Sequence, residues 1–159
     1  MTTTSKKIAL VTGASRGIGR ATALAKAGVR VMIHYGRSAS EAQALQKQIE
    51  TDGGQADTVS ADLASPDGPE KIAEQAQKVA GTNLDILVAN AGISKVAPIE
   101  NHTIEDFDNL FATNVRAPFF LVQQLLPLLG DGSNIAFIAS DAARWITGAI
   151  IPVDGGSKL

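Results

Sequence analysis

Short apolar runs alternate along the chain with longer segments in which apolar residues recur every three or four positions. The short runs predict strands at residues 8–11, 29–34, 56–60, 84–89, 135–138 and 149–153. The longer segments predict helices over residues 20–27, 38–50, 67–81 and 103–129. Strands that alternate with helices form βαβ units. The sequence therefore predicts an α/β fold with a mostly parallel sheet and helices on both faces.

Polar and proline residues mark the expected helix ends. Three pairs have the spacing of a capping box, in which two side chains bond the first backbone N–H groups of a helix: Ser38 with Glu41, Asp67 with Glu70, and Thr103 with Asp106. Pro118 and Pro127 should kink or divide the last helix. No repeat, linker or low-complexity stretch interrupts the pattern, so residues 1–159 are expected to form one domain.

Composition narrows the possible functions. The 159 residues are 45% hydrophobic and 19% charged, with a net charge of −2, so a basic surface for nucleic acid or an anionic membrane is not expected. Cysteine is absent, which excludes disulfides, thiolate metal ligands and a cysteine nucleophile. No metal site, membrane span or signal peptide is predicted. The cytoplasm is the expected compartment.

Glycines follow the first predicted strand and open the first predicted helix. Their spacing is G-x-x-x-G-x-G, with Gly13 suited to a tight turn, Gly17 to close approach of a pyrophosphate and Gly19 to close packing of the helix on the strand. Amide groups at the helix start would then face the phosphates. The alternative is a glycine-rich turn without a ligand. Because a strand precedes and a helix follows, nucleotide binding is favoured.

These motifs resemble those of classical short-chain dehydrogenases/reductases, and the sequence is similar to the 3-oxoacyl-carrier-protein reductase type. The resemblance implies a Rossmann fold, a doubly wound parallel sheet that binds NAD or NADP. Together with the charge argument given next for Arg16 and Arg37, it predicts these cofactor-binding residues: Thr12, Gly13, Ser15, Arg16, Gly17, Ile18, Gly19, Arg37, Ser38, Asp62, Leu63, Asn90, Ala91 and Gly92. In the family, Asp62 and Leu63 would contact adenine. Residues 90–92 match most of an Asn-Asn-Ala-Gly motif, although Ala89 replaces its first Asn.

The cofactor type is argued from the end of the second strand. An acid there would bind a ribose 2′-hydroxyl and repel a 2′-phosphate, but residues 34–38 read His-Tyr-Gly-Arg-Ser. Arg37 and Arg16 could both reach a 2′-phosphate, which favours NADP over NAD. The alternative is two solvated surface arginines. His34 is expected to cap the strand end. Asn90 either satisfies backbone groups between strands or lies near the nicotinamide ribose.

The catalytic part of the resemblance is incomplete. The family reaction, hydride transfer between a nicotinamide and a carbonyl or alcohol, uses a Tyr-x-x-x-Lys pair as its acid and base. The only tyrosine is Tyr35, and Ala39 stands four residues later. Asn114 matches the Asn that holds a water in the family's proton relay, although an ordinary buried amide is the alternative. Ser140 either mimics the catalytic serine or belongs to a later helix end, and the second interpretation is favoured.

The family segment that carries the missing pair would lie near residues 135 and 136, where two pieces of the family pattern meet. If strands 135–138 and 149–153 were parallel neighbours, about ten residues would join them, fewer than a parallel crossover needs. The favoured function is an NAD(P)-dependent oxidoreductase acting on a small-molecule carbonyl or alcohol, and family members commonly form homodimers or homotetramers. The alternatives are a dinucleotide-binding remnant without activity and an interaction module that binds no nucleotide.

Overall fold

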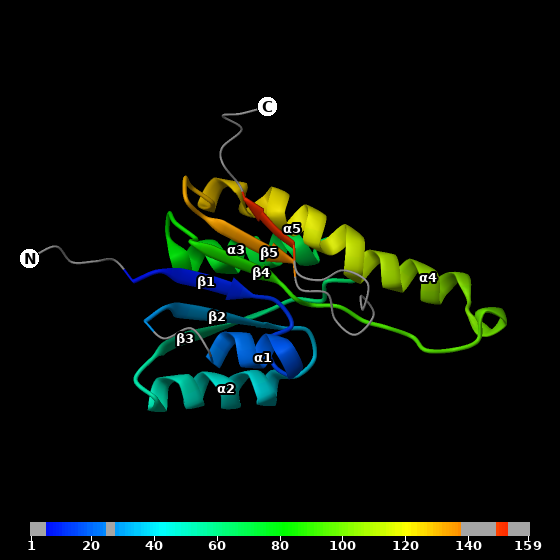
Figure 1. Cartoon of the computed structure of the whole chain (residues 1–159), viewed down its shortest axis with the longest axis horizontal. Coiled ribbons are helices and arrows are strands. Elements are labelled where there is room, and N and C mark those ends of the chain that lie inside the picture. Colours follow the sequence, from blue (N-terminus) through cyan, green and yellow to red (C-terminus); the bar gives the residue numbers. More distant parts are fainter. Residues whose placement is uncertain (1–5, 25–27, 138–148, 153–159) are drawn as a thin grey trace, which may run out of the picture.

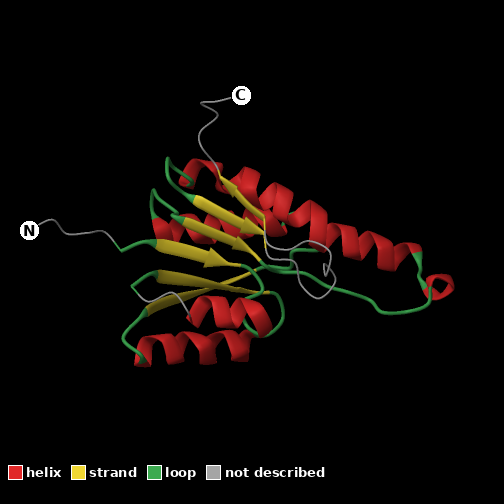
Figure 2. Cartoon of the chain, in the orientation of Figure 1, coloured by secondary structure: helices red, strands yellow, loops and turns green. Residues whose placement is uncertain are grey.

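The computed structural model describes residues 6–24, 28–137 and 149–152. They form one six-stranded sheet with the order β3-β2-β1-β4-β5-β6, with helices on both of its faces (Figures 1 and 2). The strands are β1 Ile8–Val11, β2 Arg30–Tyr35, β3 Gln55–Ser60, β4 Ile86–Ala89, β5 Asn134–Phe137 and β6 Ala149–Pro152. The first five strands are parallel, so the predicted doubly wound parallel sheet is confirmed.

The order of the strands reverses beside β1. The chain moves outward from β1 to β2 and β3, then returns to pair β4 with the other side of β1. In open α/β sheets, ligands bind beyond the carboxyl ends of the strands at such a reversal. The fold therefore directs attention to the residues that follow β1 and β4.

The last strand departs from the parallel pattern. β6 runs antiparallel to β5, with Ile151 opposite Ile135. The sequence argument against a join near residues 135 and 136 assumed that these two strands are parallel neighbours. They are neighbours, but they are antiparallel. Antiparallel neighbours need no crossover helix, so a short connection suffices. Residues 138–148, which include Ser140, lie outside the described residues.

Helices cover the sheet in two layers. In Figure 1, α1 and α2 lie on one face of the sheet, and α3 lies behind it with α5 alongside. The bounds are α1 Gly17–Leu24, α2 Ala39–Thr51, α3 Gly68–Ala80, α4 Ile104–Phe111 and α5 Ala117–Leu125. Among the described helices, none has the length and apolar character needed to cross a membrane.

Alternate residues of each strand enter two separate cores. Leu10 of β1 packs in the core that α3 and α5 cover, where Ile72 and Leu121 are fully buried. Val11, the next residue, packs in the core that α1 and α2 cover, where Leu45 is fully buried. Burying such a side chain contributes roughly 1.5–3 kcal/mol. Burial on both faces explains why the strands are continuous apolar runs.

Only one of the three predicted capping boxes forms. The Thr103 hydroxyl accepts from the Asp106 N–H at 3.1 Å, and the Asp106 carboxylate accepts from the Thr103 N–H at 2.9 Å. Thr103 has the extended backbone (φ −100°, ψ 164°) that a capping oxygen needs to reach the next turn.

The capping predictions at Ser38 and Asp67 are wrong, because neither side chain bonds the helix backbone. Ser38 has ψ 64°, and Asp67 already has helical angles, so their oxygens point elsewhere. The Asp67 carboxylate instead accepts from the Ser65 hydroxyl at 2.5 Å and pairs with Lys71 at 2.6 Å.

The long helix predicted over residues 103–129 is divided, as its prolines indicated. A π turn, Ala112–Arg116, separates α4 from α5, and Pro118, which has no N–H to donate to the preceding turn, is the second residue of α5. Pro127 lies in a short 3₁₀ helix, Leu126–Leu128. The π turn carries Asn114.

Candidate functional site

The glycine loop leaves β1 at the point where the strand order reverses. Gly13 and Gly17 have φ angles of +62° and +56°, which L side chains rarely adopt, so the tight turn expected at Gly13 is present. Around Gly17, a Cβ atom would meet no atom within 4 Å. The neighbouring Ile18 side chain is 52% exposed. The outer side of the loop is therefore open at the start of α1.

The inner side of the same loop is closely packed. A Cβ on Gly19 would lie 2.5 Å from the Gly13 carbonyl oxygen and 2.5 Å from Nδ2 of Asn90. A Cβ on Gly13 would lie 2.9 Å from Cα of Ala91. Gly19 thus lets the helix start pack on its own loop and on the end of β4, rather than on a strand residue as its spacing suggested.

Thr12 and Asn90 fasten the end of β1 to the end of β4. The Thr12 hydroxyl accepts from the backbone N–H groups of Asn90 and Ala91, each at 2.9 Å. Asn90 Nδ2 donates to the carbonyls of Thr12 at 2.9 Å and Gly13 at 3.2 Å. Both side chains are buried. The structure therefore shows Asn90 satisfying backbone groups between strands, and its contact with a ribose stays a prediction.

His34 joins three strand ends. Its Nδ1 accepts from the Gly13 N–H at 3.1 Å, and its Nε2 lies 3.0 Å from the Ala61 carbonyl beyond β3. The His34 carbonyl accepts from the Ala14 N–H at 2.9 Å. Because Nδ1 accepts, the proton belongs on Nε2. Burial lowers the pKa of His34 to about 4, against the Ala61 carbonyl and the Asp62 charge, which raise it.

The sequence placed His34 at a strand end but did not anticipate this bridge. Its signal was a polar residue directly after the apolar run 31–33 of β2. A polar side chain at such a buried position must find partners. Which partners it finds depends on strands that are distant in sequence.

The two arginines expected at a 2′-phosphate lie at the surface. Arg16, Arg37 and Asp62 are exposed, and Ser38 is half-buried at the start of α2. None of the ion pairs among the described residues includes Arg16 or Arg37. The pKa of Glu41 is lowered by its own backbone N–H and the Ser40 hydroxyl, and also by the charge of Arg16. Arg16 is therefore within electrostatic reach of the first turn of α2.

The remaining cofactor positions surround the same edge of the sheet. The Asp62 carboxylate follows β3 and accepts from the Ala64 N–H at 2.9 Å. Leu63 is buried in the α3–α5 core, so its side chain is not available at the surface. Ser15 is buried within the loop, Ala91 is half-buried and Gly92 is exposed beyond β4.

Asn114 holds the connection after β4 against the π turn. Its Oδ1 accepts from the Ile93 N–H at 2.9 Å, and its Nδ2 donates to the Ile93 carbonyl at 2.8 Å. Both polar atoms of the amide are therefore occupied by one backbone residue. The water-holding role implied by the family resemblance stays a prediction. The location of Asn114 in a π turn is typical of functional positions.

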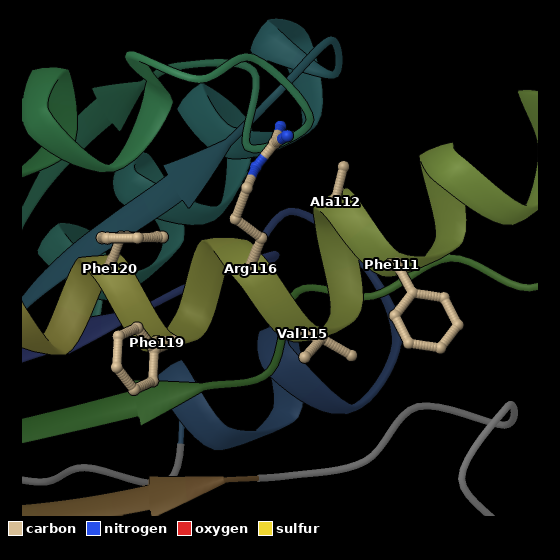
Figure 3. A pocket seen from close by; sticks show the side chains of 6 residues that line it. All are labelled: Phe111, Ala112, Val115, Arg116, Phe119 and Phe120. Carbon is tan, nitrogen blue, oxygen red and sulfur yellow. The ribbon is translucent and has the colours of Figure 1, made fainter.

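A groove of about 360 Å³ lies over the end of α4, the π turn and the start of α5 (Figure 3). Its lining is Phe111, Ala112, Val115, Arg116, Phe119 and Phe120. Arg116 extends away from Val115 and Phe119 in Figure 3, and its guanidinium donates to the Ala64 carbonyl before α3. No residue of the glycine loop lines this groove. Its apolar surface does not suit the phosphates of a dinucleotide.

Comparison with known proteins agrees with this geometry. The family model for short chain dehydrogenase matches residues 7–156. Hydroxynaphthalene reductase arp2 of Aspergillus fumigatus is 38% identical over 141 residues, which are 87% of this chain and 51% of that protein. Versicolorin reductase stcU of Emericella nidulans is 36% identical over 139 residues, 86% of this chain and 52% of that protein. The chain thus spans about half the length of these relatives.

Solved structures give the same result. Landomycin C-6 ketoreductase LanV, with bound NADP and rabelomycin, superposes with a TM-score of 0.81 at 43% identity, covering 90% of this chain and 61% of that one. A short chain dehydrogenase from Burkholderia cenocepacia in complex with NADP gives a TM-score of 0.79 at 38% identity, covering 90% and 59%. The strand order, the glycine loop and these matches lead to one conclusion: the chain belongs to the short-chain dehydrogenase family.

Proposed function

We propose that this chain binds NADP(H) at the carboxyl edge of β1, β2 and β4, and that it forms the nucleotide-binding part of an oxidoreductase. One observation carries the proposal. The glycine loop is closed on its inner side, at Gly13 and Gly19, and open on its outer side, at Gly17. Turn glycines at helix ends, such as Gly53 and Gly81, are equally open, so the distinguishing feature is open backbone at a helix start. A phosphate group needs it, because backbone N–H groups and the helix dipole bind anions there.

Each predicted residue except Thr12, whose hydroxyl bonds Asn90 and Ala91, has a proposed part in holding the cofactor. Backbone groups of residues 13–19, with Ser15 and Ile18, would line the pyrophosphate. Arg16 and Arg37, which form no ion pair among the described residues, would bind the 2′-phosphate beside Ser38. Asp62 and the backbone of Leu63 would border adenine, and residues 90–92 the nicotinamide ribose. The two solved relatives with NADP support NADP over NAD.

The proposed reaction is the family's exchange of a hydride with a small-molecule carbonyl or alcohol. The bound nicotinamide would supply or accept that hydride. This chain's own part is to bind and orient the cofactor, with Asn114 holding the turn after β4 and Ser140 as the second candidate catalytic position. No Tyr-x-x-x-Lys pair stands in the sequence, because Tyr35 is its only tyrosine. We therefore expect this chain by itself to bind the cofactor without reducing a carbonyl.

The proposal also covers compartment, assembly and domain organisation. The absence of cysteine favours the cytoplasm. The family resemblance favours a homodimer or homotetramer. The continuous sheet favours one dinucleotide-binding domain over residues 1–159.

NADPH titration followed by the nicotinamide fluorescence tests the binding proposal. We expect saturable enhancement by this chain and none with Gly17→Trp, because the indole would fill the open side of the loop. Arg16→Ala and Arg37→Ala should each weaken NADPH binding about tenfold or more, since a charged hydrogen bond contributes roughly 1.5–3 kcal/mol. NADH binding should change little in the same variants. Equal effects on both cofactors would contradict the 2′-phosphate assignment.

Turnover tests the second part of the proposal. NADPH oxidation with a ketone substrate should not exceed the background rate, even when cofactor binding is saturated. Intact-mass measurement of the sample is the control, because it confirms that the assayed chain has a mass of 16.5 kDa. Turnover that tracks a chain of that mass would show that another residue replaces the missing acid and base.

A further inference from the structure

One buried titratable side chain next to the glycine loop has no part in the proposed cofactor contacts. His34 is 2% exposed, and the residues before it in β2, Met32 and Ile33, are fully buried. An imidazole in such a place requires hydrogen-bond partners for both ring nitrogens. His34 has them on opposite sides: the Gly13 N–H on Nδ1 and the Ala61 carbonyl on Nε2.

Gly13 is held by hydrogen bonds from the ends of two other strands, β2 and β4. From β2, the His34 ring accepts its N–H at 3.1 Å, and the His34 carbonyl accepts the next N–H, that of Ala14, at 2.9 Å. From β4, Asn90 Nδ2 donates to its carbonyl at 3.2 Å. With its N–H and its carbonyl both bonded, Gly13 is fixed at the point where the glycine loop leaves β1.

We propose that His34 is a positioning residue of the nucleotide site, which orients the glycine loop by accepting the Gly13 N–H while β3 holds its other ring nitrogen. The proposal rests on the proposed nucleotide binding and adds to it a residue that would touch no part of the cofactor. His34 is not a candidate acid or base, since both ring nitrogens are occupied within the protein. A low pKa agrees with the acceptor role, because a protonated Nδ1 would face the Gly13 N–H as a second donor.

Two variants distinguish the two hydrogen bonds that the His34 ring makes, one to Gly13 and one to Ala61. In His34→Asn, the Oδ1 atom occupies nearly the place of Nδ1 and can accept from Gly13, but the side chain is too short for Ala61. In His34→Gln, the terminal Nε2 can reach Ala61, but no acceptor stands near Gly13. Each variant therefore loses one of the two hydrogen bonds, and they differ in which one they lose.

The experiment measures NADPH affinity and thermal unfolding for the full chain and both variants. We expect the Asn variant to bind within about threefold of the wild type and the Gln variant to bind about tenfold more weakly, which corresponds to one buried donor left without its acceptor. A merely structural role would make affinity follow the melting temperature in both variants. Wild-type affinity in the Gln variant, or equal weakening in both, would overturn the proposal.

A measurement on the unaltered chain does not depend on how the variants fold. The ¹⁵N chemical shifts of the His34 ring, recorded at pH 7 without nucleotide, should show an unprotonated Nδ1 and a protonated Nε2. A proton on Nδ1 would overturn the proposal. If the wild type binds no NADPH, the proposed function itself fails, and the positioning role fails with it. If the wild type binds and only the variant difference is missing, the proposed function stands.

Discussion

Two regions of the molecule place their side chains differently: the edge of the sheet around the glycine loop, and the arm formed by α4 and α5. Around the loop, Thr12, His34 and Asn90 are buried, and each bonds a neighbouring strand or the residues that follow it. Along the arm, large apolar side chains are exposed: Ile104 at 81% and Phe119 at 66%. In the first region, the buried polar side chains find their hydrogen-bond partners within the chain. The second leaves apolar surface in water.

That difference separates two kinds of site. A polar, closed and cross-bonded edge fixes a backbone shape, which is what an anion-binding loop requires. An apolar surface of this extent is typical of contact surfaces rather than of polar ligand sites. In the arm, Phe107 stacks on Phe111 at 4.3 Å, and Phe119 meets Phe120 edge-on at 5.3 Å. These pairs pack on one another while staying partly exposed.

The sharpest comparison lies within α5, which has one buried and one exposed side. Leu121→Ala should lower the free energy of unfolding by about 3–4 kcal/mol, because Leu121 is 1% exposed and its loss leaves a cavity in the core. Phe119→Ala should change it by no more than about 0.5 kcal/mol. Urea unfolding measures both. Equal losses would mean that the Phe119 side of α5 is covered in solution.

Acidification should affect the loop edge before the arm. His34 takes up a proton near pH 6.5 in the unfolded chain but only near pH 4 when folded. The unfolded state therefore binds more protons in this window, and stability should fall by at most about 3 kcal/mol as the pH drops through it. Urea unfolding between pH 7 and pH 4 measures the slope. His34→Asn should remove the His34 part of this slope, whereas His102→Asn, the other histidine, should leave it in place.

The inner and outer glycines of the loop give a matched pair. Gly19→Ala should lower the free energy of unfolding by about 2 kcal/mol, because its Cβ would overlap the Gly13 carbonyl and Asn90. Gly17→Ala meets no neighbouring atom and should cost only about 1 kcal/mol, from its positive φ. Thermal unfolding distinguishes them. If Gly17→Ala cost more, the outer side of the loop would not be open.

The smallest effect is expected at the start of the arm. α4 buries no residue fully, so its first turn depends on the Thr103 capping box. Thr103→Ala should destabilise that turn by about 1 kcal/mol and speed amide exchange at residues 105–107 about fivefold. Thr103→Ser keeps the hydroxyl and serves as the control. A comparable change in the exchange of β1 would show that the arm and the sheet unfold together.

Local features of the structure followed from the sequence. β1 was predicted at residues 8–11 and forms there, and the capping box at Thr103 and the division of the last helix near Pro118 are confirmed. The predicted caps at Ser38 and Asp67 do not form, because the φ and ψ angles of these residues turn the side chains away from the helix N–H groups. Sequence spacing does not reveal those angles. The cofactor residues implied by resemblance stay predictions. Ser140 lies outside the described residues.

The sequence by itself determined the apolar strands, the glycine turn and the lack of a Tyr-x-x-x-Lys pair, because each depends on neighbouring residues or on residue counts. Only the tertiary structure decided the partners of buried polar groups. Thr12 bonds Asn90 across 78 residues, Asn114 bonds Ile93 across 21, and His34 bonds Gly13 from the next strand. A buried polar atom must be paired, but sequence spacing does not say with which group. That choice, together with the antiparallel direction of β6, depends on which strands lie side by side.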